Sequence, residues 1–293
     1  MKQYKAIFFD WDGTAVVSRK APVDEIVARM KPLLQKGIVL AIISGTTYDN
    51  IAQGKLEQYF DEKELKYLYL GLGRGAFTYS FEKGRPVVFA EKMPDTETLL
   101  RIHDISYAIH RKLLEHYKYP TDIVFCRPNY CKVDLMADND RGSSLFMQEN
   151  EIALLRTRLY RHGVTGGLRD LLQISRRIGE QHGMAVSPTC DAKYLEVGIS
   201  DKSDNVAAIL RHIGERAQIT APECAFWGDE YVSIEQNVFG SDSFMMTEES
   251  KGGDFFDVSE VSGERPEGVQ RVGGGVKQFL EFLQKQAEGE EKG

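Results

Sequence analysis

The sequence predicts an α/β protein in which a doubly wound, mostly parallel sheet is interrupted by an inserted α+β domain. Two observations predict this fold class. Near the start of the chain, short apolar runs alternate with segments of helical periodicity, and the same alternation returns near the end. Between these two parts, hairpin patterns stand beside long helical segments, which is typical of a separate α+β unit.

The start of the chain follows a strand–helix–strand–helix–strand pattern. Residues 4–9 (YKAIFF) are rich in apolar and aromatic side chains, and apolar residues recur at helical spacing over 23–35. The run 38–43 (IVLAII) is continuously apolar, which favours a strand buried on both faces of a parallel sheet. We expect a second helix over 48–59 and a third strand over 66–72.

The inserted part begins with a predicted antiparallel hairpin, whose strands at 77–81 and 86–89 flank Lys83-Gly84. The segments that follow are, in order, a helix over 96–117, strands over 122–125 and 130–136, helices over 149–161 and 168–182, and strands over 185–188 and 193–197. We therefore place the inserted domain at 82–190, between two parts of the sheet domain at 1–81 and 191–293.

The parallel pattern resumes after the insertion. A helix is expected over 203–213, strands over 224–227 and 243–246, and a final helix over 276–286. Two domains also fit the length of 293 residues, since about 100–200 residues per domain is usual.

Composition and charge exclude several classes of function. The net charge of −7 and the pI near 5.5 argue against a protein that grips nucleic acid, which needs basic surface. The first residues carry a carboxylate within their apolar stretch, unlike a signal peptide. No apolar run reaches the roughly 18 residues of a membrane helix. We expect a cytoplasmic enzyme that binds neither nucleic acid nor a membrane.

The cysteines do not predict a disulfide framework or a zinc site. They are few, and none forms a C-x-x-C pair. Buried thiols are the interpretation that we favour for Cys126, Cys131, Cys190 and Cys224.

Polar residues follow the ends of the predicted strands. Asp10 and Asp12 follow the first strand, Ser44 and Gly45 the second, and Asp229 and Glu230 the apolar run CAFW, while Lys202 precedes a helix. Ligands of open α/β sheets bind outside the carboxyl ends of the strands, so we expect these residues to gather at one edge of the sheet. A lone D-x-D-G-T could also be an ordinary turn, but the four segments together favour a site.

This set of residues suits phosphoryl transfer. Asp10 is the candidate nucleophile, because a carboxylate can form an aspartyl-phosphate and divide one difficult displacement into two easier ones. Asp12 is the candidate acid and base, which protonates the leaving alkoxide and then activates water.

The remaining members would hold the phosphoryl group and a metal ion. We expect Ser44, Gly45 and Lys202 to bind the phosphoryl oxygens and offset their charge. Mg²⁺ requires hard oxygen ligands, which Asp10, the main-chain carbonyl of Asp12 and Asp229 could provide.

These segments resemble the four motifs of the haloacid dehalogenase (HAD) superfamily in their usual order. FFDWDGT resembles motif I, IISGT motif II, the lysine of GISDKSDNVAAIL motif III and FWGDE motif IV. The resemblance covers about residues 1–80 and 190–275. It implies a Rossmann-like core and a Mg²⁺-dependent phosphatase. The insertion between motifs II and III is similar to the large α/β caps of the Cof-type phosphatases and of the sucrose-, trehalose- and mannosyl-phosphate enzymes, which close over the leaving group.

The chain departs from the family pattern at two motifs. Motif III has DKSDN where Cof-type members have a lysine followed by a glycine, and motif IV lacks the further aspartate expected four or five residues on. The third metal carboxylate is therefore open: we favour the adjacent Glu230 over Glu235, and Asp242 lies much further along the chain.

Two weaker signals lie outside the motifs. In CRPNYCK, Arg127, Asn129 and Lys132 could contact an anionic or hydroxyl-rich leaving group as specificity residues of the cap, although an exposed basic turn explains them equally well. Residues 71–76 (GLGRGA) imitate a dinucleotide-binding loop, but no helix pattern follows them. We interpret them as a hinge into the cap.

The sequence thus predicts a Mg²⁺-dependent phosphatase that hydrolyses a small phosphate monoester through an aspartyl-phosphate, with a sugar phosphate as the substrate implied by the cap type. A phosphomutase could use the same two aspartates, and a non-catalytic protein could keep the fold to bind a phosphorylated metabolite. A dehalogenase is disfavoured, because its chemistry requires neither Asp12 nor a metal. The sequence does not distinguish a monomer from a homodimer.

Overall fold

The computed structural model describes residues 2–125, 127–138, 149–191 and 193–289, so that Cys126 lies outside the described residues. Its larger sheet has eight strands. In spatial order they are β14 (Val269–Arg271), β13 (Asp254–Asp257), β10 (Cys224–Gly228), β1 (Ala6–Phe9), β2 (Val39–Ile43), β3 (Leu68–Leu72), β4 (Phe77–Glu82) and β5 (Arg85–Glu91). The first six are parallel, and β4 and β5 are antiparallel.

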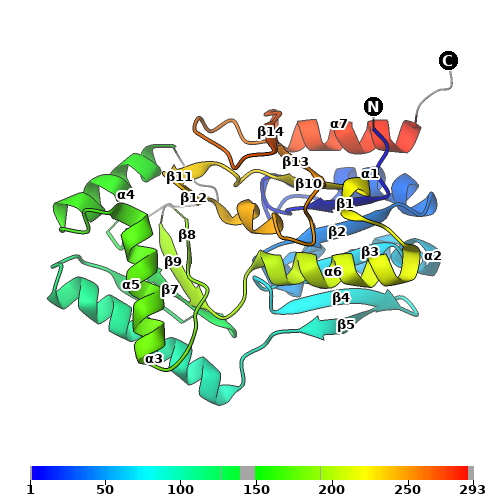
Figure 1. Ribbon diagram of the computed structural model, residues 1–293. Coiled ribbons are helices and arrows are strands. Elements are labelled where there is room, and N and C mark those ends of the chain that lie inside the picture. The colour runs from blue at the N-terminus through cyan, green and yellow to red at the C-terminus, as the bar shows by residue number, and fades with distance from the viewer. Residues whose placement is uncertain (1, 126, 139–148, 192, 290–293) are drawn as a thin grey trace.

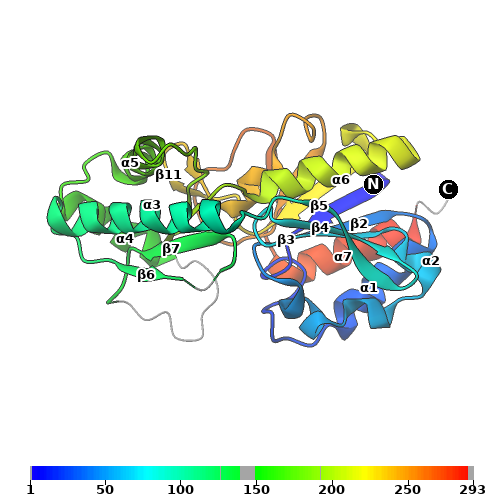
Figure 2. The same cartoon turned by 90° about the horizontal axis from the view of Figure 1, so that it is seen from below.

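Helices cover both faces of this sheet, as the continuously apolar strands predict. Helices α1 (Asp24–Gln35) and α7 (Gly275–Glu288) pack on one face and α6 (Lys202–Ala217) on the other (Figure 2). Side chains of β1 alternate between the two cores, because successive residues of a strand point to opposite faces. The short α2 (Glu62–Leu65) precedes β3.

A smaller antiparallel sheet forms the core of the cap. Its strands, in spatial order, are β6 (Asp122–Val124), β7 (Tyr130–Asp134), β9 (Tyr194–Gly198) and β8 (Thr189–Cys190). Helices α3 (Thr96–Glu115), α4 (Glu149–Arg161) and α5 (Gly167–Gln181) complete this unit, which lies beside the large sheet (Figure 1).

At both ends of the insertion, the strand pairing differs from the expected boundaries between the sheet domain and the cap. The predicted hairpin is β4–β5, but β5 belongs to the large sheet, and β9 belongs to the cap sheet. We therefore propose cap boundaries near residues 92 and 200 in place of 82 and 190.

Three predicted elements are wrong. The helix expected over 48–59 is three short 3₁₀ segments, because Ala52 and Gln53 have φ of 48° and 57°, which a continuous helix does not allow. The strand expected over 243–246 is a 3₁₀ turn, and β13 takes its place beside β10. A short apolar run cannot distinguish a buried turn from a strand. The strand expected over 185–188 begins only at Thr189.

A hairpin reaches from the sheet domain into the cap. Strands β11 (Ser233–Glu235) and β12 (Val238–Phe239) pair with each other and lie between the two units (Figure 1). Val232, Ile234 and Val238 belong to the apolar core of the cap. The two units therefore share part of one core. Among the described helices, none is both long and apolar enough to cross a lipid bilayer.

Candidate active site

The predicted site residues meet at the carboxyl edge of the large sheet. Asp10 follows β1 directly, and its backbone N–H donates to Trp227 at the end of β10 over 2.9 Å. Ser44 continues β2 in the same way, donating from its backbone N–H to the carbonyl of Gly71. Because β2 and β10 flank β1 in parallel register, segments far apart in the sequence converge here.

Lys202 connects the site to α6. It is the first residue of the helix, which begins with a capping box formed by Asp201 and Asp204. The ammonium Nζ lies 2.7 Å from Oδ1 of Asp10 and 2.7 Å from Oδ1 of Asp242. Burial opposes the charged form, but the two carboxylates outweigh it and raise the pKa of Lys202 above its usual value. The lysine is therefore held as a cation beside Asp10.

Acidic side chains crowd around this lysine. Burial raises the pKa of Asp10, Asp229 and Glu230, and repulsion from neighbouring carboxylates, Asp242 among them, adds to the effect. Oδ1 of Asp229 accepts a hydrogen bond from the Thr14 hydroxyl over 3.1 Å. The cluster carries more negative charge than Lys202 can neutralise, so it needs a further cation or bound protons.

Gly13 makes room for Asp229. Its φ of 93° lies in the left-handed region, and a Cβ at this position would stand 2.2 Å from Oδ2 of Asp229. Gly13 of the first motif therefore has two roles. It allows the turn after β1, and it leaves space for the Asp229 carboxylate of the fourth motif.

Asp12 lies in a different electrostatic setting. Its Oδ2 accepts from Arg19 over 2.9 Å, while its Oδ1 is buried and has no hydrogen-bond partner among the described residues. Burial raises the pKa of Asp12, although Arg19 acts in the opposite direction. A raised pKa lets a carboxyl group keep its proton to a higher pH, which suits the role of a general acid.

The loop after β2 faces the same pocket. Ser44 and Gly45 line it together with Thr46, whose backbone N–H donates to the Ser44 hydroxyl over 3.3 Å. A Cβ on Gly45 would meet nothing within 4 Å. The loop therefore presents backbone and hydroxyl groups to open space, where a phosphoryl group could bind.

The donor set suits a hard cation such as Mg²⁺, although the described residues form no ready cage. Among the described residues, no group of three or more His, Cys, Asp or Glu side chains is already arranged to hold a metal. Mg²⁺ usually takes one or two carboxylates and completes its shell with water and substrate oxygens. The surplus of carboxylates and the unpartnered Oδ1 of Asp12 fit such an ion.

The structure separates the three candidates for the third carboxylate. Glu230 lines the pocket and accepts from the Ser241 hydroxyl over 2.8 Å. Glu235 instead accepts from the backbone N–H of Arg169 in the first turn of α5, in the cap. Asp242 is fully buried, bonded to Lys202 and, through Oδ2, to the backbone N–H of Glu230. The sequence named Asp242 only as the most distant of the three candidates, because the β11–β12 hairpin lengthens the spacing after Asp229.

A cavity of about 410 Å³ joins this edge of the sheet to the cap, and both Arg127 and Lys132 line it. Asn129 does not belong to its described lining. The Asn129 side chain is buried and donates to the carbonyl of Gly73 over 2.7 Å, which ties the cap to the segment after β3. Of the three predicted cap residues, two therefore face the cavity and one anchors the cap.

The glycine-rich segment 71–76 behaves as a connection between the units. Arg74 is buried and donates to the carbonyl oxygens of Ser187 and Ser200, which lie near the C-terminal end of the insertion in the sequence. A Cβ on Gly75, whose φ is 91°, would stand 2.3 Å from the carbonyl oxygen of Asp201. The segment leads into strand β4 and not into a helix, which agrees with the hinge interpretation.

Solved phosphatase structures share this fold. IMP-nucleotidase from Plasmodium falciparum, truncated at its N-terminus and bound to IMP, aligns with a TM-score of 0.58 and 12% identity over 98% of this chain and 68% of that one. The sucrose-phosphatase of Synechocystis, in complex with sucrose and phosphate, aligns with a TM-score of 0.56 and 12% identity over 97% of this chain and 99% of that one.

At these identities the likeness establishes the fold alone, and it confirms the predicted fold class. No protein-family model matches the chain, and no curated protein matches it.

Proposed function

We propose that this chain is a Mg²⁺-dependent phosphatase that hydrolyses a small phosphate monoester. The proposal rests above all on Lys202, whose ammonium lies 2.7 Å from the candidate nucleophile Asp10 at the bottom of a cavity that the cap covers. The fold shared with a nucleotidase and a sucrose-phosphatase supports a phosphoric monoester hydrolase.

In the first step, a carboxylate oxygen of Asp10 attacks phosphorus and the bond to the leaving oxygen breaks. Asp12 gives its proton to that oxygen, so the leaving group departs as an alcohol. In the second step, Asp12 takes a proton from water, the water oxygen bonds to phosphorus, and the acyl-phosphate bond to Asp10 breaks. Lys202 holds Oδ1 of Asp10 in place and offsets charge on the phosphoryl oxygens.

A bound Mg²⁺ would neutralise the phosphoryl group so that it can approach the carboxylates. Asp10, Asp229 and the main-chain carbonyl of Asp12 are the groups that we expect to hold it, with Glu230 acting next to them. Ser44, Gly45 and the backbone after β2 would hold the phosphoryl oxygens.

A sugar phosphate is the substrate that we propose within this class. The cavity of about 410 Å³ has room for a small metabolite, and polar side chains from the cap line it. The solved relatives act on IMP or are named for sucrose phosphate, and both of these substrates carry a phosphorylated sugar.

Two other functions use the same residues. A phosphomutase would return the phosphoryl group to a second hydroxyl of the sugar, and would release isomerised product without free phosphate. A binding protein would hold a phosphorylated ligand without turnover. The raised pKa of Asp12 beside Asp10 favours catalysis, because a sensor needs no proton donor at that position.

The test is the hydrolysis of p-nitrophenyl phosphate with and without Mg²⁺. We expect turnover that EDTA abolishes and that Asp10→Asn lowers by more than about 1,000-fold, since the variant lacks the nucleophile. Asp104→Asn, at an exposed position of α3, serves as the matched control and should keep full activity. Metal-independent turnover, or turnover that survives Asp10→Asn, would contradict the proposal.

A further inference from the structure

Several buried polar atoms have no hydrogen-bond partner among the described residues, and three of these atoms belong to the lining of one cavity. They are Oδ1 of Asp12, Nε of Arg19 and Oγ1 of Thr46, whose residues line the cavity between the sheet and the cap. The remaining atoms belong to residues outside its described lining: Arg29, His212, Trp227 and Tyr231. Buried polar groups in proteins are normally paired, so we expect groups bound in this cavity to supply the missing partners.

Of these three residues, Thr46 is the one whose side chain makes no hydrogen bond at all to the described residues. Asp12 and Arg19 bond to each other through their other atoms, and Asp12 already has a role as the candidate acid and base. The Thr46 side chain is part of neither the expected site nor the steps proposed above. Its hydroxyl therefore calls for a separate explanation.

The backbone fixes the position of the Thr46 side chain. Its N–H donates to the Ser44 hydroxyl over 3.3 Å, and its carbonyl accepts from the backbone N–H of Gly73 over 2.8 Å. The residue is only 3% exposed, and branching at Cβ restricts its χ1 angle further. The hydroxyl is thus held in place before any ligand binds, and its proton is available for donation.

The contact between Thr46 and Ser44 places two hydroxyl groups in one turn. Oγ of Ser44 accepts from Thr46, which leaves the proton of the Ser44 hydroxyl available to a ligand as well. Because Oγ1 of Thr46 is three bonds from the donating nitrogen, the two hydroxyl oxygens are at most about 7 Å apart. Both hydroxyls can therefore reach different oxygens of one phosphoryl group.

This turn also lies beside the candidate nucleophile. Strand β2 continues into it and pairs in parallel with β1, in a register that sets Phe9 opposite Ile42. Asp10 and Ser44 therefore leave neighbouring strands at the same edge of the sheet. A phosphoryl group that Asp10 attacks must lie at this edge, whereas the cap covers the cavity from the other side.

We propose that the Thr46 hydroxyl donates a hydrogen bond to a phosphoryl oxygen of the substrate, which makes Thr46 a further binding residue beside Ser44 and Gly45. This inference rests on the proposed phosphatase function and extends its phosphoryl site. It makes two predictions that a structural role would not make together. Loss of the hydroxyl should weaken phosphate binding, and it should leave the ligand-free fold as stable as before.

The binding of inorganic phosphate tests the first prediction, because this ligand has no leaving group. Isothermal titration calorimetry is carried out with saturating Mg²⁺ and needs no turnover. We expect Thr46→Val, which replaces the hydroxyl by a methyl group of similar size, to raise the Kd by about 10- to 100-fold, the range of one hydrogen bond to a charged group. Thr46→Ser retains the hydroxyl and should bind phosphate nearly as well as the wild type.

Urea unfolding without ligand tests the second prediction. The free energy of unfolding of Thr46→Val should equal or exceed that of the wild type, because the substitution removes a buried hydroxyl that has no partner in the described part of the chain. A Thr46→Val protein that is clearly less stable would overturn the inference, since the hydroxyl would then have a structural partner.

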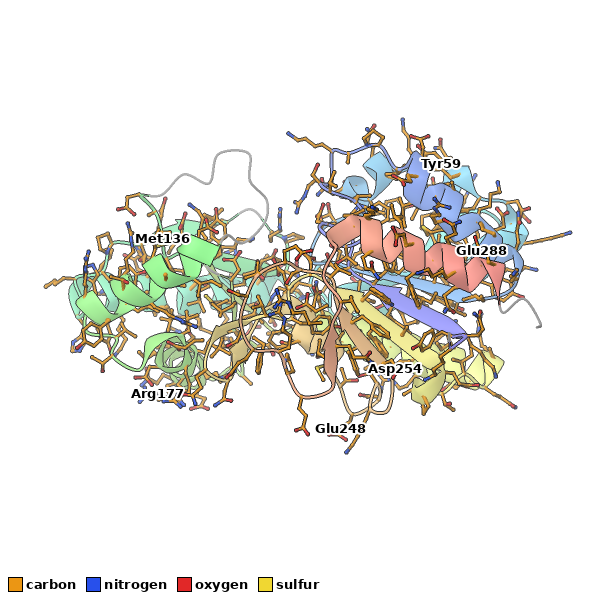
Figure 3. All side chains as sticks on the ribbon, turned by 90° about the horizontal axis from the view of Figure 1, so that it is seen from above. Tyr59, Met136, Arg177, Glu248, Asp254 and Glu288 are labelled. Atoms are coloured by element: carbon orange, nitrogen blue, oxygen red, sulfur yellow. The ribbon has the colours of Figure 1, made fainter. Side chains whose placement is uncertain are left out.

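Two control variants remove hydroxyl groups from the same segment of the chain. The Thr47 hydroxyl accepts from Nδ2 of Asn50 over 3.1 Å, and Thr47 is outside the described lining of the cavity. Tyr59 is 39% exposed and lies at the surface of the sheet domain (Figure 3). Thr47→Val and Tyr59→Phe should both leave the Kd for phosphate unchanged.

The outcomes separate this inference from the proposed function. A wild type that neither binds phosphate nor hydrolyses p-nitrophenyl phosphate would refute the phosphatase, and this inference with it. A wild type that does both, with a Thr46→Val variant that binds phosphate equally well, would overturn the inference alone. The same holds if Thr46→Val raises only the KM for a sugar phosphate, because the hydroxyl would then contact the leaving group.

Discussion

Lys202 is bonded at once to Asp10 and to Asp242, at 2.7 Å from each carboxylate. One of these acids is the candidate nucleophile, and the other belongs to the segment that follows the β11–β12 hairpin. Oδ2 of Asp242 also accepts from the backbone N–H of Glu230. Asp242 thereby sets the position of two groups of the site without lining the described cavity itself.

We predict that Asp242→Asn lowers kcat by about 10- to 100-fold, since it removes the charge that fixes Lys202 but keeps an oxygen for the N–H of Glu230. Steady-state kinetics with p-nitrophenyl phosphate measure the effect. Asp104→Asn is again the control. Unchanged kcat in Asp242→Asn would show that Lys202 needs only Asp10.

Without metal, the free energy of unfolding should depend on pH, because the buried carboxyl groups bind protons more tightly in the folded state. Burial raises the pKa of Asp10 to about 8, above its usual value of 3.8. The folded state then binds more protons than the unfolded chain between these two values, so this group stabilises the fold at low pH and loses that contribution as the pH rises.

We therefore predict that, in EDTA, the wild type loses stability relative to Asp10→Asn as the pH rises from about 4 to about 8, by at most about 1.4 kcal/mol per pH unit. Urea unfolding at several pH values measures the difference. Added Mg²⁺ should stabilise the wild type more at pH 8 than at pH 5.5. A difference that is constant across this window would mean that Asp10 stays ionised in the metal-free fold.

The β11–β12 hairpin contributes side chains to the core of the cap. We therefore expect a substitution in the hairpin to lower both stability and activity. The Ile234 side chain is fully buried in the cap core, and its carbonyl accepts from Nε of Arg156 in α4 over 3.0 Å. Ile234→Ala should lower the free energy of unfolding by about 2–5 kcal/mol. It should also lower kcat, because Glu230 and Asp242 flank the hairpin.

Leu154→Ala is the matched control for this change, since Leu154 is 46% exposed on α4; we expect less than about 1 kcal/mol there. Urea unfolding and kinetics are measured on both variants. If Ile234→Ala unfolds more easily yet keeps its kcat in the folded fraction, the hairpin stabilises the cap without positioning the acids.

Much of the site could be predicted from sequence because its determinants are local. A buried parallel strand has a continuous apolar pattern, and the residue after it reaches the sheet edge whatever the rest of the fold does. Asp10, Ser44 and Asp229 were found in this way. Asp10 and Ser44 line one cavity, and Asp229 lies close enough to Asp10 for the two carboxylates to repel each other. Lys202 was chosen because it precedes a predicted helix and because a phosphoryl group needs a positive charge beside it, and the resemblance to motif III supported that choice.

The parts that sequence did not predict depend on distant packing. Glu235 and Asp242 are both acids downstream of Asp229, and only the β11–β12 pairing shows that one reaches α5 and the other Lys202. Asn129 and Arg127 share one loop but contact different units. The boundaries that we propose for the cap differ from the expected ones for the same reason, because pairing partners decide which sheet a strand joins.

Substitution of Gly13 tests whether Asp229 binds the metal ion, and Gly268 serves as a control for the backbone strain of the substitution. Its φ of 93° is nearly the same as the 91° of Gly268, so alanine at either position has a similar conformational cost of about 1–3 kcal/mol. A Cβ on Gly13 would collide with Asp229, whereas a Cβ on Gly268 would meet nothing within 4 Å.

We predict that Gly13→Ala displaces the Asp229 carboxylate and raises the Mg²⁺ concentration needed for half-maximal activity by about 10-fold or more, while Gly268→Ala shifts only stability. Mg²⁺ titrations of the rate, together with thermal unfolding of both variants, measure the two effects. Equal Mg²⁺ dependence in the two variants would mean that Asp229 is not a metal ligand, and the third carboxylate would then have to be sought at Glu230.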